Sequence, residues 1–269
     1  MLARLALGLL LLSTPLGATE IVVAPGAGTL AAAIAGAAPD DVLILKGGAY
    51  LGPVTIDRPL TLQGDGTAII DGQGQGTVIT ITGDDVVLTG LHVTGSGTVN
   101  ADLDAGIKIV KGADRARIEG NRLTDNMHGV DVHGGLDTIV RANAIEGRQN
   151  LRMNERGNGI YIWNSPGTII ENNIVRWGRD GIFSNASRKG TYRNNLFRDL
   201  RFAVHYMYTH DSEVSGNVSI GNHLGFAIMF SDRVVVKNNM SLGDREHGVM
   251  LNFANAGDIM GNLVRGGTK

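Results

Sequence analysis

The amino-acid sequence predicts an all-β fold, a right-handed single-stranded parallel β-helix with coils of about 22 residues and a short N-terminal capping helix. Three observations indicate this solenoid. Asparagine recurs at intervals of 22, 30, 22, 22, 22 and 23 residues, a glycine column runs beside it, and apolar and polar residues alternate between the columns. Each repeat is too short for a helix and two ordinary strands, so we expect one coil of short strands per repeat.

The two columns set the register of the coils. An asparagine at a fixed corner tolerates a left-handed turn and can hydrogen-bond to adjacent coils, so we assign these asparagines a structural role. The second column follows after eight residues in most coils, which indicates two strands per repeat. Leucine-rich repeats share the period, but their leucine frame is missing. The columns are Asn121, Asn143, Asn173, Asn195, Asn217, Asn239 and Asn262, and Gly129, Gly159, Gly181, Ala203, Gly225 and Gly248.

The N-terminal residues 1–18 have the features of a cleaved secretory signal. Arg4 is followed by an apolar run over residues 5–12 and by small residues before Thr19. The apolar run is shorter than the ~20 residues that span a membrane, although an uncleaved anchor is the alternative. We therefore expect the mature protein to be exported and soluble.

Residues 19–269 are expected to form one parallel β-helix domain. An alanine-rich helix is predicted over residues 29–38, ended by Pro39, where it would cover the first coil. Strands are predicted at 42–45, 54–56, 60–62, 68–72, 78–81 and 86–88. At the other end, residues 261–264 form a complete corner only five residues before Lys269, so the domain is expected to be truncated at its C-terminal end, or covered there by something else.

The composition narrows the classes of function. A net charge of −2 excludes a strongly basic nucleic-acid binder, and 43% apolar residues can build a sizeable core. The 39 glycines have no collagen-like period and indicate many tight turns. The chain has no cysteine, which excludes disulfides, cysteine-ligated metals and thiol catalysis. Soft-metal chemistry must therefore use histidine and methionine.

One face of the coils is predicted to bind a partner or ligand. Counting from the glycine column, the second and fourth residues point outward, and they are aromatic residues, histidines and methionines rather than typical surface residues. The predicted partner or ligand face contains Asp131, His133, Tyr161, Trp163, Phe183 and Met250. The alternative is that the insertion at residues 149–156 covers this patch and turns it into a small second core.

The same face offers a set of soft metal ligands. Met207 and Met229 are 22 residues apart and hence stacked, and His205 precedes Met207 by two residues. Thioether and imidazole groups suit monovalent copper, although a methionine pair can also serve packing alone. The predicted metal ligands are His205, Met207, His210 and Met229, with copper as the cofactor; His223 and His247 have a solvated corner role by default.

A carbohydrate-active β-helix, such as a lyase, hydrolase or epimerase, is the alternative function. Tyr161, Trp163 and Phe183 could stack on sugar rings. Proton transfer would then fall to Asp131, to Asp180 or to the pair His210 and Asp211. The spacing of the carboxylates supplies no second acid opposite the first.

Five segments of the chain closely resemble the NosD family: residues 159–164, 179–184, 200–212, 222–231 and 246–251. The resemblance is specific over residues 150–269, because it includes outward and corner residues that a β-helix does not require. It implies a periplasmic, non-enzymatic maturation factor for the copper–sulfur centre of nitrous oxide reductase.

The resemblance also implies the partners. They are the ATPase and permease subunits of an ABC transporter, a copper chaperone lipoprotein and nitrous oxide reductase itself. No nucleic acid is expected, and the membrane is reached only through the transporter. Family members are longer than this chain, with further coils and a C-terminal region.

Overall fold

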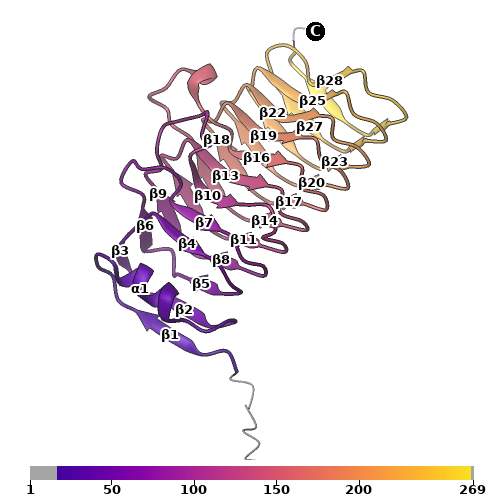
Figure 1. Ribbon diagram of the computed structural model, residues 1–269. Coiled ribbons are helices and arrows are strands. Elements are labelled where there is room, and N and C mark those ends of the chain that lie inside the picture. Colours follow the sequence, from indigo (N-terminus) through magenta and orange to yellow (C-terminus); the bar gives the residue numbers. More distant parts are fainter. Residues whose placement is uncertain (1–16, 268–269) are drawn as a thin grey trace, which may run out of the picture.

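The predicted parallel β-helix is confirmed by a computed structural model, which describes residues 17–267 (Figure 1). Parallel strands form three sheets of 11, 9 and 10 strands, called sheet 1, sheet 2 and sheet 3 below. Each full coil contributes one strand to each sheet, so the expectation of two strands per repeat is wrong. The third strand was missed because it is only three residues long in most coils and follows directly after the asparagine corner.

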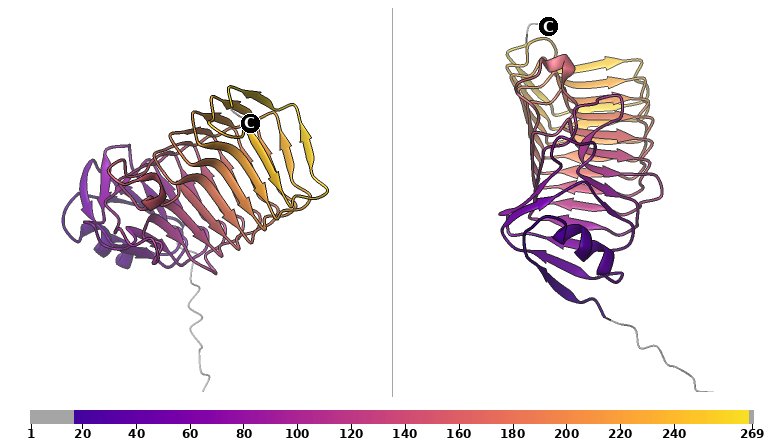
Figure 2. Two further views of the ribbon diagram at one scale, coloured as in Figure 1. Left: turned by 90° about the horizontal axis from the view of Figure 1, so that it is seen from above. Right: turned by 60° about the vertical axis from the view of Figure 1, so that its left-hand side comes forward.

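The three sheets run along the length of the solenoid, with their strands stacked like rungs (Figure 2). Sheet 1 contains β1 (Glu20–Val23), β2 (Val42–Leu45), β5 (Thr61–Gln63), β8 (Val87–Thr89), β11 (Arg117–Glu119), β14 (Ile139–Arg141), β17 (Ile169–Glu171), β20 (Thr191–Arg193), β23 (Glu213–Ser215), β26 (Val235–Lys237) and β29 (Asp258–Met260). Sheet 2 contains β4 (Val54–Ile56), β7 (Ile79–Ile81), β10 (Ala105–Ile109), β13 (His128–His133), β16 (Ile160–Trp163), β19 (Asp180–Asn185), β22 (Phe202–Met207), β25 (Leu224–Met229) and β28 (Val249–Asn252). Sheet 3 contains β3 (Gly48–Leu51), β6 (Ala68–Asp71), β9 (His92–Thr94), β12 (Arg122–Thr124), β15 (Ala144–Glu146), β18 (Ile174–Arg176), β21 (Leu196–Arg198), β24 (Val218–Ile220), β27 (Met240–Leu242) and β30 (Leu263–Arg265).

The asparagine column has the structural role that the repeats predict. Asn195 lies buried at the corner between sheets 1 and 3, where its Oδ1 accepts the backbone N–H of Asn173 at 2.9 Å. Its Nδ2 donates to the carbonyl of Ile170 at 3.0 Å and to Oδ1 of Asn217, the next asparagine, at 2.9 Å. This ladder satisfies buried backbone groups at a corner where strand pairing is interrupted.

The glycine column marks the corner from sheet 3 into sheet 2, where the backbone presses against the core. A Cβ at Gly181 would lie 2.4 Å from Cδ1 of Phe197, and a Cβ at Gly159 would lie 2.3 Å from Cγ1 of Val175. Both neighbours are buried core residues. The absence of a Cβ in this column therefore leaves room for the core side chains, and the column marks where each strand of sheet 2 begins.

The helix α1 (Thr29–Gly36) covers the N-terminal end of the solenoid and buries Leu30 and Ile34 (Figure 2). It ends two residues before the predicted Ala38, because Ala37 is already extended. A short 3₁₀ turn, η1 (Met153–Glu155), lies in the long loop before β16. Residues 1–16 of the predicted signal lie outside the described residues. Between residues 17 and 267, no helix has the length and apolar character needed to cross a membrane.

Candidate functional site

The outward side of sheet 2 carries two columns of chemically active side chains. In the register of the strands, the first column runs through Lys108, Asp131, Tyr161, Phe183, His205, Ala227 and Met250. The second column runs through His133, Trp163, Asn185, Met207, Met229 and Asn252. The structure thus places the whole predicted partner or ligand face, and three of the four predicted metal ligands, on one surface.

The aromatic members of this surface stack on one another along the solenoid axis. Tyr161 and Phe183 are nearly parallel, with ring centroids 5.3 Å apart, and His133 stacks on Trp163 at 4.4 Å. Phe183 in turn packs against His205 at 4.8 Å. The ring faces therefore contact each other, and the ring edges point away from the sheet.

His205 is held by a buried carboxylate from the preceding coil. Oδ2 of Asp180 lies 3.0 Å from Nδ1 of His205, and Arg201 donates two hydrogen bonds to the same carboxylate, at 2.8 Å and 2.6 Å. Asp180 is 1% exposed. Burial alone would raise the pKa of Asp180, but the hydrogen bonds from His205 and Arg201 outweigh it and keep that pKa below its ordinary value. Asp180 is therefore an ionised acceptor.

An ionised acceptor fixes the tautomer of His205. Its Nδ1 donates to Asp180, so the lone pair of the neutral ring is on Nε2. Nε2 is buried and has no hydrogen-bond partner in the part of the chain that the structure describes. The ring is wedged between Phe183 and Phe202, whose centroid lies 4.9 Å away. A carboxylate that orients an imidazole in this way is the usual outer support of a metal-binding histidine.

Two thioethers lie beside this imidazole. Met207 is two residues after His205 on β22, on the same face, and Met229 pairs directly with Met207 on β25. Both methionines are partly exposed. Adjacent strands are about 4.8 Å apart, so the side chains of Met207 and Met229 are within reach of each other. Within residues 17–267, no group of three or more His, Asp or Glu side chains is placed to hold a metal.

The fourth predicted ligand, His210, is not on this surface. Tyr208 turns the chain with a φ of 51°, and His210 lies beyond that corner, paired with Arg188. Nδ1 of His210 accepts the backbone N–H of Asp232 at 3.0 Å and lies 3.6 Å from Oδ2 of that residue. The side chain therefore lies at the corner after β22, where the sequence places it, and its role as a metal ligand stays a prediction.

A stack of corner aromatics adjoins the methionines. Tyr208, Phe230 and Phe253 follow the second column directly in three successive coils, each with a φ near 50°. Their rings stack at 5.2 Å, and Phe253 is 72% exposed. Bulky residues rarely adopt the left-handed backbone conformation, so the backbone at these three aromatic positions is in a conformation that is unfavourable for their residue type. Their 22- and 23-residue spacing, immediately after the outward column, was the signal that could have found them.

Asp131 and its neighbours form the other end of the surface. Asp131 points outward as the alternation predicts, but it is fully buried. Nζ of Lys108 lies 3.5 Å from Oδ2 of Asp131 and donates to the carbonyls of Asp102 and Leu103, and His128 contacts Asn100. The loop before β10 is therefore anchored at this end of the surface.

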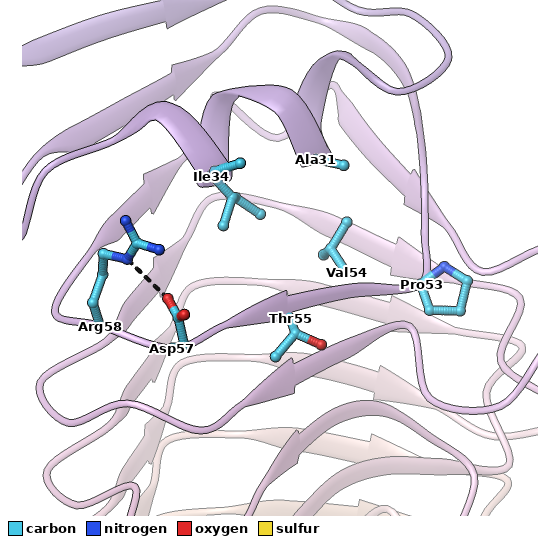
Figure 3. Close-up of a pocket in the computed structure, with 8 residues that line it drawn as sticks. Ala31, Ile34, Pro53, Val54, Thr55, Asp57 and Arg58 are labelled. Atoms are coloured by element: carbon cyan, nitrogen blue, oxygen red, sulfur yellow. Dashed lines mark hydrogen bonds and ion pairs between the residues drawn. The ribbon is translucent and has the colours of Figure 1, made fainter.

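A separate hollow lies between α1 and β4, the N-terminal strand of sheet 2 (Figure 3). It has a volume of about 300 Å³, and its apolar lining includes Ile34, Pro53 and Val54. Asp57 and Arg58 at its rim pair with each other at 2.8 Å, and Arg58 also donates to the carbonyl of Ala37. Its charged groups are thus already satisfied, and sheet 2 is the better candidate site.

Comparison with known families and proteins gives one consistent match. The profile of the family described as "Periplasmic copper-binding protein (NosD)" matches residues 141–269. A protein of Stutzerimonas stutzeri named "Probable ABC transporter binding protein NosD" is 34% identical over 220 residues, which are 82% of this chain and 50% of the relative. A protein of the same name from Pseudomonas aeruginosa is 34% identical over 222 residues, 82% of this chain and 52% of that protein. The chain spans about half the length of these curated relatives.

Solved structures with the same architecture are mostly polysaccharide-degrading enzymes. An alginate lyase from Paenibacillus superposes with a TM-score of 0.71 at 18% identity, covering 92% of this chain and 98% of the lyase. A polygalacturonase from Erwinia carotovora superposes with a TM-score of 0.70 at 14% identity, covering 95% and 97% of the two chains. At such identities the similarity is one of fold alone. The relatives that share sequence are named as binding proteins.

Proposed function

Since this chain belongs to the NosD family over residues 141–269, we propose that it is a periplasmic accessory protein for maturation of the copper–sulfur centre of nitrous oxide reductase. The family is described as periplasmic, in agreement with the N-terminal signal expected from the sequence. In this role the protein binds copper, or a copper-carrying partner, and passes the metal on. Copper is its cargo rather than a resident cofactor.

The observation that carries the proposal is the unpaired Nε2 of His205 beside two stacked methionines. Asp180 holds the imidazole in the tautomer that presents a lone pair, and Met207 and Met229 add two thioethers. A soft nitrogen and sulfur set prefers monovalent copper over zinc or magnesium. The methionines remain partly exposed, which suits an ion that must arrive and leave.

An enzymatic function on carbohydrate is less well supported by this surface. Sugar rings stack on the faces of aromatic side chains, but Tyr161 and Phe183 cover each other's faces. Both oxygens of Asp180 are occupied by Arg201 and His205, so this carboxylate is not free to act as an acid or base. Together with the names of the relatives, these contacts favour binding over catalysis.

Association with the transporter is proposed for sheet 3. One outward column of this sheet is apolar in six consecutive coils, and the column beside it carries ion pairs such as Arg176 with Glu146 at 2.7 Å. The apolar column contains Ala144, Ile174, Leu196, Val218, Met240 and Leu263. A continuous exposed apolar column is typical of a protein contact surface. The ATPase and permease, the chaperone lipoprotein and the reductase are the proposed partners.

Anaerobic titration tests the copper site. The chain is titrated with Cu⁺ against a chromogenic Cu⁺ chelator, and one ion per chain is expected. The double variant Met207→Leu, Met229→Leu should lose this binding, because leucine conserves volume but offers no ligand, and such exchanges usually cost less than about 1.5 kcal/mol in stability. Met240→Leu on sheet 3 is the matched control. Equal Cu⁺ affinity of the double variant and the parent would reject the site.

A further inference from the structure

The carboxylate of Asp131 lacks the partners that a buried charge requires. Its side chain is 0% exposed, and neither oxygen accepts a well-formed hydrogen bond from any residue between 17 and 267, since Nζ of Lys108 approaches Oδ2 only to 3.5 Å. More than nine in ten buried polar groups in native proteins have a hydrogen-bond partner, so an exception calls for a physical explanation. Burial raises the pKa of Asp131 to about 7, against the opposing effect of Lys108. The environment around this carboxylate is therefore incomplete.

A second unpaired group lies next to Asp131. Nδ1 of His133 is 3.8 Å from Oδ1 of Asp131, and it too is buried without a hydrogen-bond partner among the described residues. The imidazole is held in place by its stack on Trp163. Both side chains come from β13 and point to the same face. Two lone-pair donors are thus fixed side by side with nothing between them.

Lys108 supplies the nearest positive charge. Its Nζ lies 3.5 Å from Oδ2 of Asp131 and donates to the carbonyl of Asp102 at 3.1 Å. The ammonium group balances the charge of the carboxylate only through space, because 3.5 Å is too long for a strong charge-assisted hydrogen bond. Its side chain is 21% exposed, so it can swing toward solvent.

The gap between the two unpaired atoms fits a single ion. Zinc lies about 2.0–2.2 Å from carboxylate oxygen and imidazole nitrogen, and tetrahedral geometry then puts these two atoms about 3.4 Å apart. The observed 3.8 Å needs only a small closure. Because the oxygens have almost no accessible surface, a sugar or peptide cannot reach them, and an ion with its water ligands enters only when the Lys108 ammonium group moves out toward solvent.

We propose that Asp131 and His133 form a cation site for a borderline divalent ion of the zinc type, with Lys108 as the competing internal cation. Carboxylate and imidazole are the ligands that zinc prefers, in contrast to the thioethers near His205. Water completes the coordination, since two protein ligands leave positions open. Three strand steps along sheet 2, about 14 Å, separate this site from Met207, so the two sites bind independently.

Calorimetric titration of the full chain with Zn²⁺ tests this site. One ion is expected to bind to the parent. Asp131→Asn keeps the shape of the side chain and removes its charge. His133→Phe keeps the stack on Trp163 and removes the ring nitrogens. Each variant should weaken Zn²⁺ binding by about tenfold or more, which is the usual effect of losing a group that binds or supports a metal. Lys108→Met should tighten binding, because it removes the competing charge.

The controls separate this site from the copper site and from loss of folding. The Met207→Leu, Met229→Leu variant should bind Zn²⁺ as the parent does, and circular dichroism reports whether each variant is folded. Tighter binding by Lys108→Met can be caused neither by misfolding nor by ligation elsewhere. The proposal is overturned if Asp131→Asn binds Zn²⁺ like the parent, or if neither the parent nor Lys108→Met binds Zn²⁺ at millimolar concentration.

Discussion

Asp180 and His205 belong to successive coils, and Oδ2 of Asp180 lies 3.0 Å from Nδ1 of His205. This contact leaves Nε2 as the only ring nitrogen available to an external ligand. Arg201 holds the carboxylate from the other side, so the imidazole cannot rotate without breaking a buried three-residue network. The orientation of His205 is thus set before any ion arrives.

Asp180→Asn should therefore weaken Cu⁺ binding by about 10- to 100-fold, the range typical of groups that support a metal ligand. The neutral amide no longer favours the Nδ1–H tautomer. Chelator competition gives the affinity, and ¹⁵N NMR of the imidazole gives the tautomer, which a merely structural role of Asp180 would not shift. Asp211→Asn, whose carboxylate pairs with Arg233 on the exposed corner, is the control and should leave both unchanged. Parent-like affinity and tautomer in Asp180→Asn would show that His205 does not depend on this contact.

The asparagine ladder makes a second prediction. Asn195→Ala leaves the backbone N–H of Asn173 and the carbonyl of Ile170 unpaired in the interior. Each unpaired group costs about 1–3 kcal/mol, so urea denaturation should show a loss of about 2–5 kcal/mol in the free energy of unfolding. Asn150→Ala in the exposed loop should change it by less than about 0.5 kcal/mol. If the two variants were equally stable, the ladder would have no energetic role.

The raised pKa of Asp131 predicts a pH-dependent difference in stability. The folded carboxyl binds its proton more tightly, with a pKa of about 7 against an ordinary 3.8, so this group lowers the free energy of unfolding as pH rises from about 4 to 7. Asp131→Asn cannot ionise. In the presence of a chelator, the parent should lose up to about 4 kcal/mol relative to this variant between pH 4 and pH 8. A constant difference across this range would contradict the shifted pKa.

The backbone conformation of the corner aromatics predicts that asparagine can replace one of them with little change in the free energy of unfolding. Phe230→Asn places a residue that accepts left-handed backbone at a φ of 50°, which gains about 1–2 kcal/mol, and it loses two stacking contacts worth about 0.5–1.5 kcal/mol each. The net change in the free energy of unfolding should be within about 1 kcal/mol. Thermal denaturation measures it, with the core change Val236→Ala as a destabilising reference. A loss above about 2 kcal/mol would show that the stack serves stability rather than surface contact.

The fold was predictable because every coil requires particular residue types at the same positions, so these residues recur with the period of the coil. Asn195 satisfies corner backbone groups and Gly181 makes room for Phe197, so both recur with the coil period. The same period places Met207 opposite Met229. Features that repeat along the axis can therefore be read from spacing alone.

The site was only partly predictable because its key contacts break the period. Asp180 reaches diagonally to His205 from the first residue of β19, directly before the glycine column, where the alternation along the strand has only just begun and does not tell which way a side chain points. His210 lies at the corner after Tyr208, as its position in the sequence indicates, but spacing could not tell that its Nδ1 accepts the backbone N–H of Asp232. Asp131 is buried although the alternation points it outward, and its neighbour Lys108 is held by the carbonyls of Asp102 and Leu103 in the loop before β10.

The coordination shell of bound copper tests the central proposal most directly. X-ray absorption spectra of the chain loaded with one equivalent of Cu⁺ under anaerobic conditions report the atoms around the metal. A shell of sulfur with one imidazole nitrogen is expected, with sulfur lost in Met207→Leu, Met229→Leu and retained in Met240→Leu. A shell of nitrogen and oxygen without sulfur, unchanged in the double variant, would contradict the assignment of this face as the copper site.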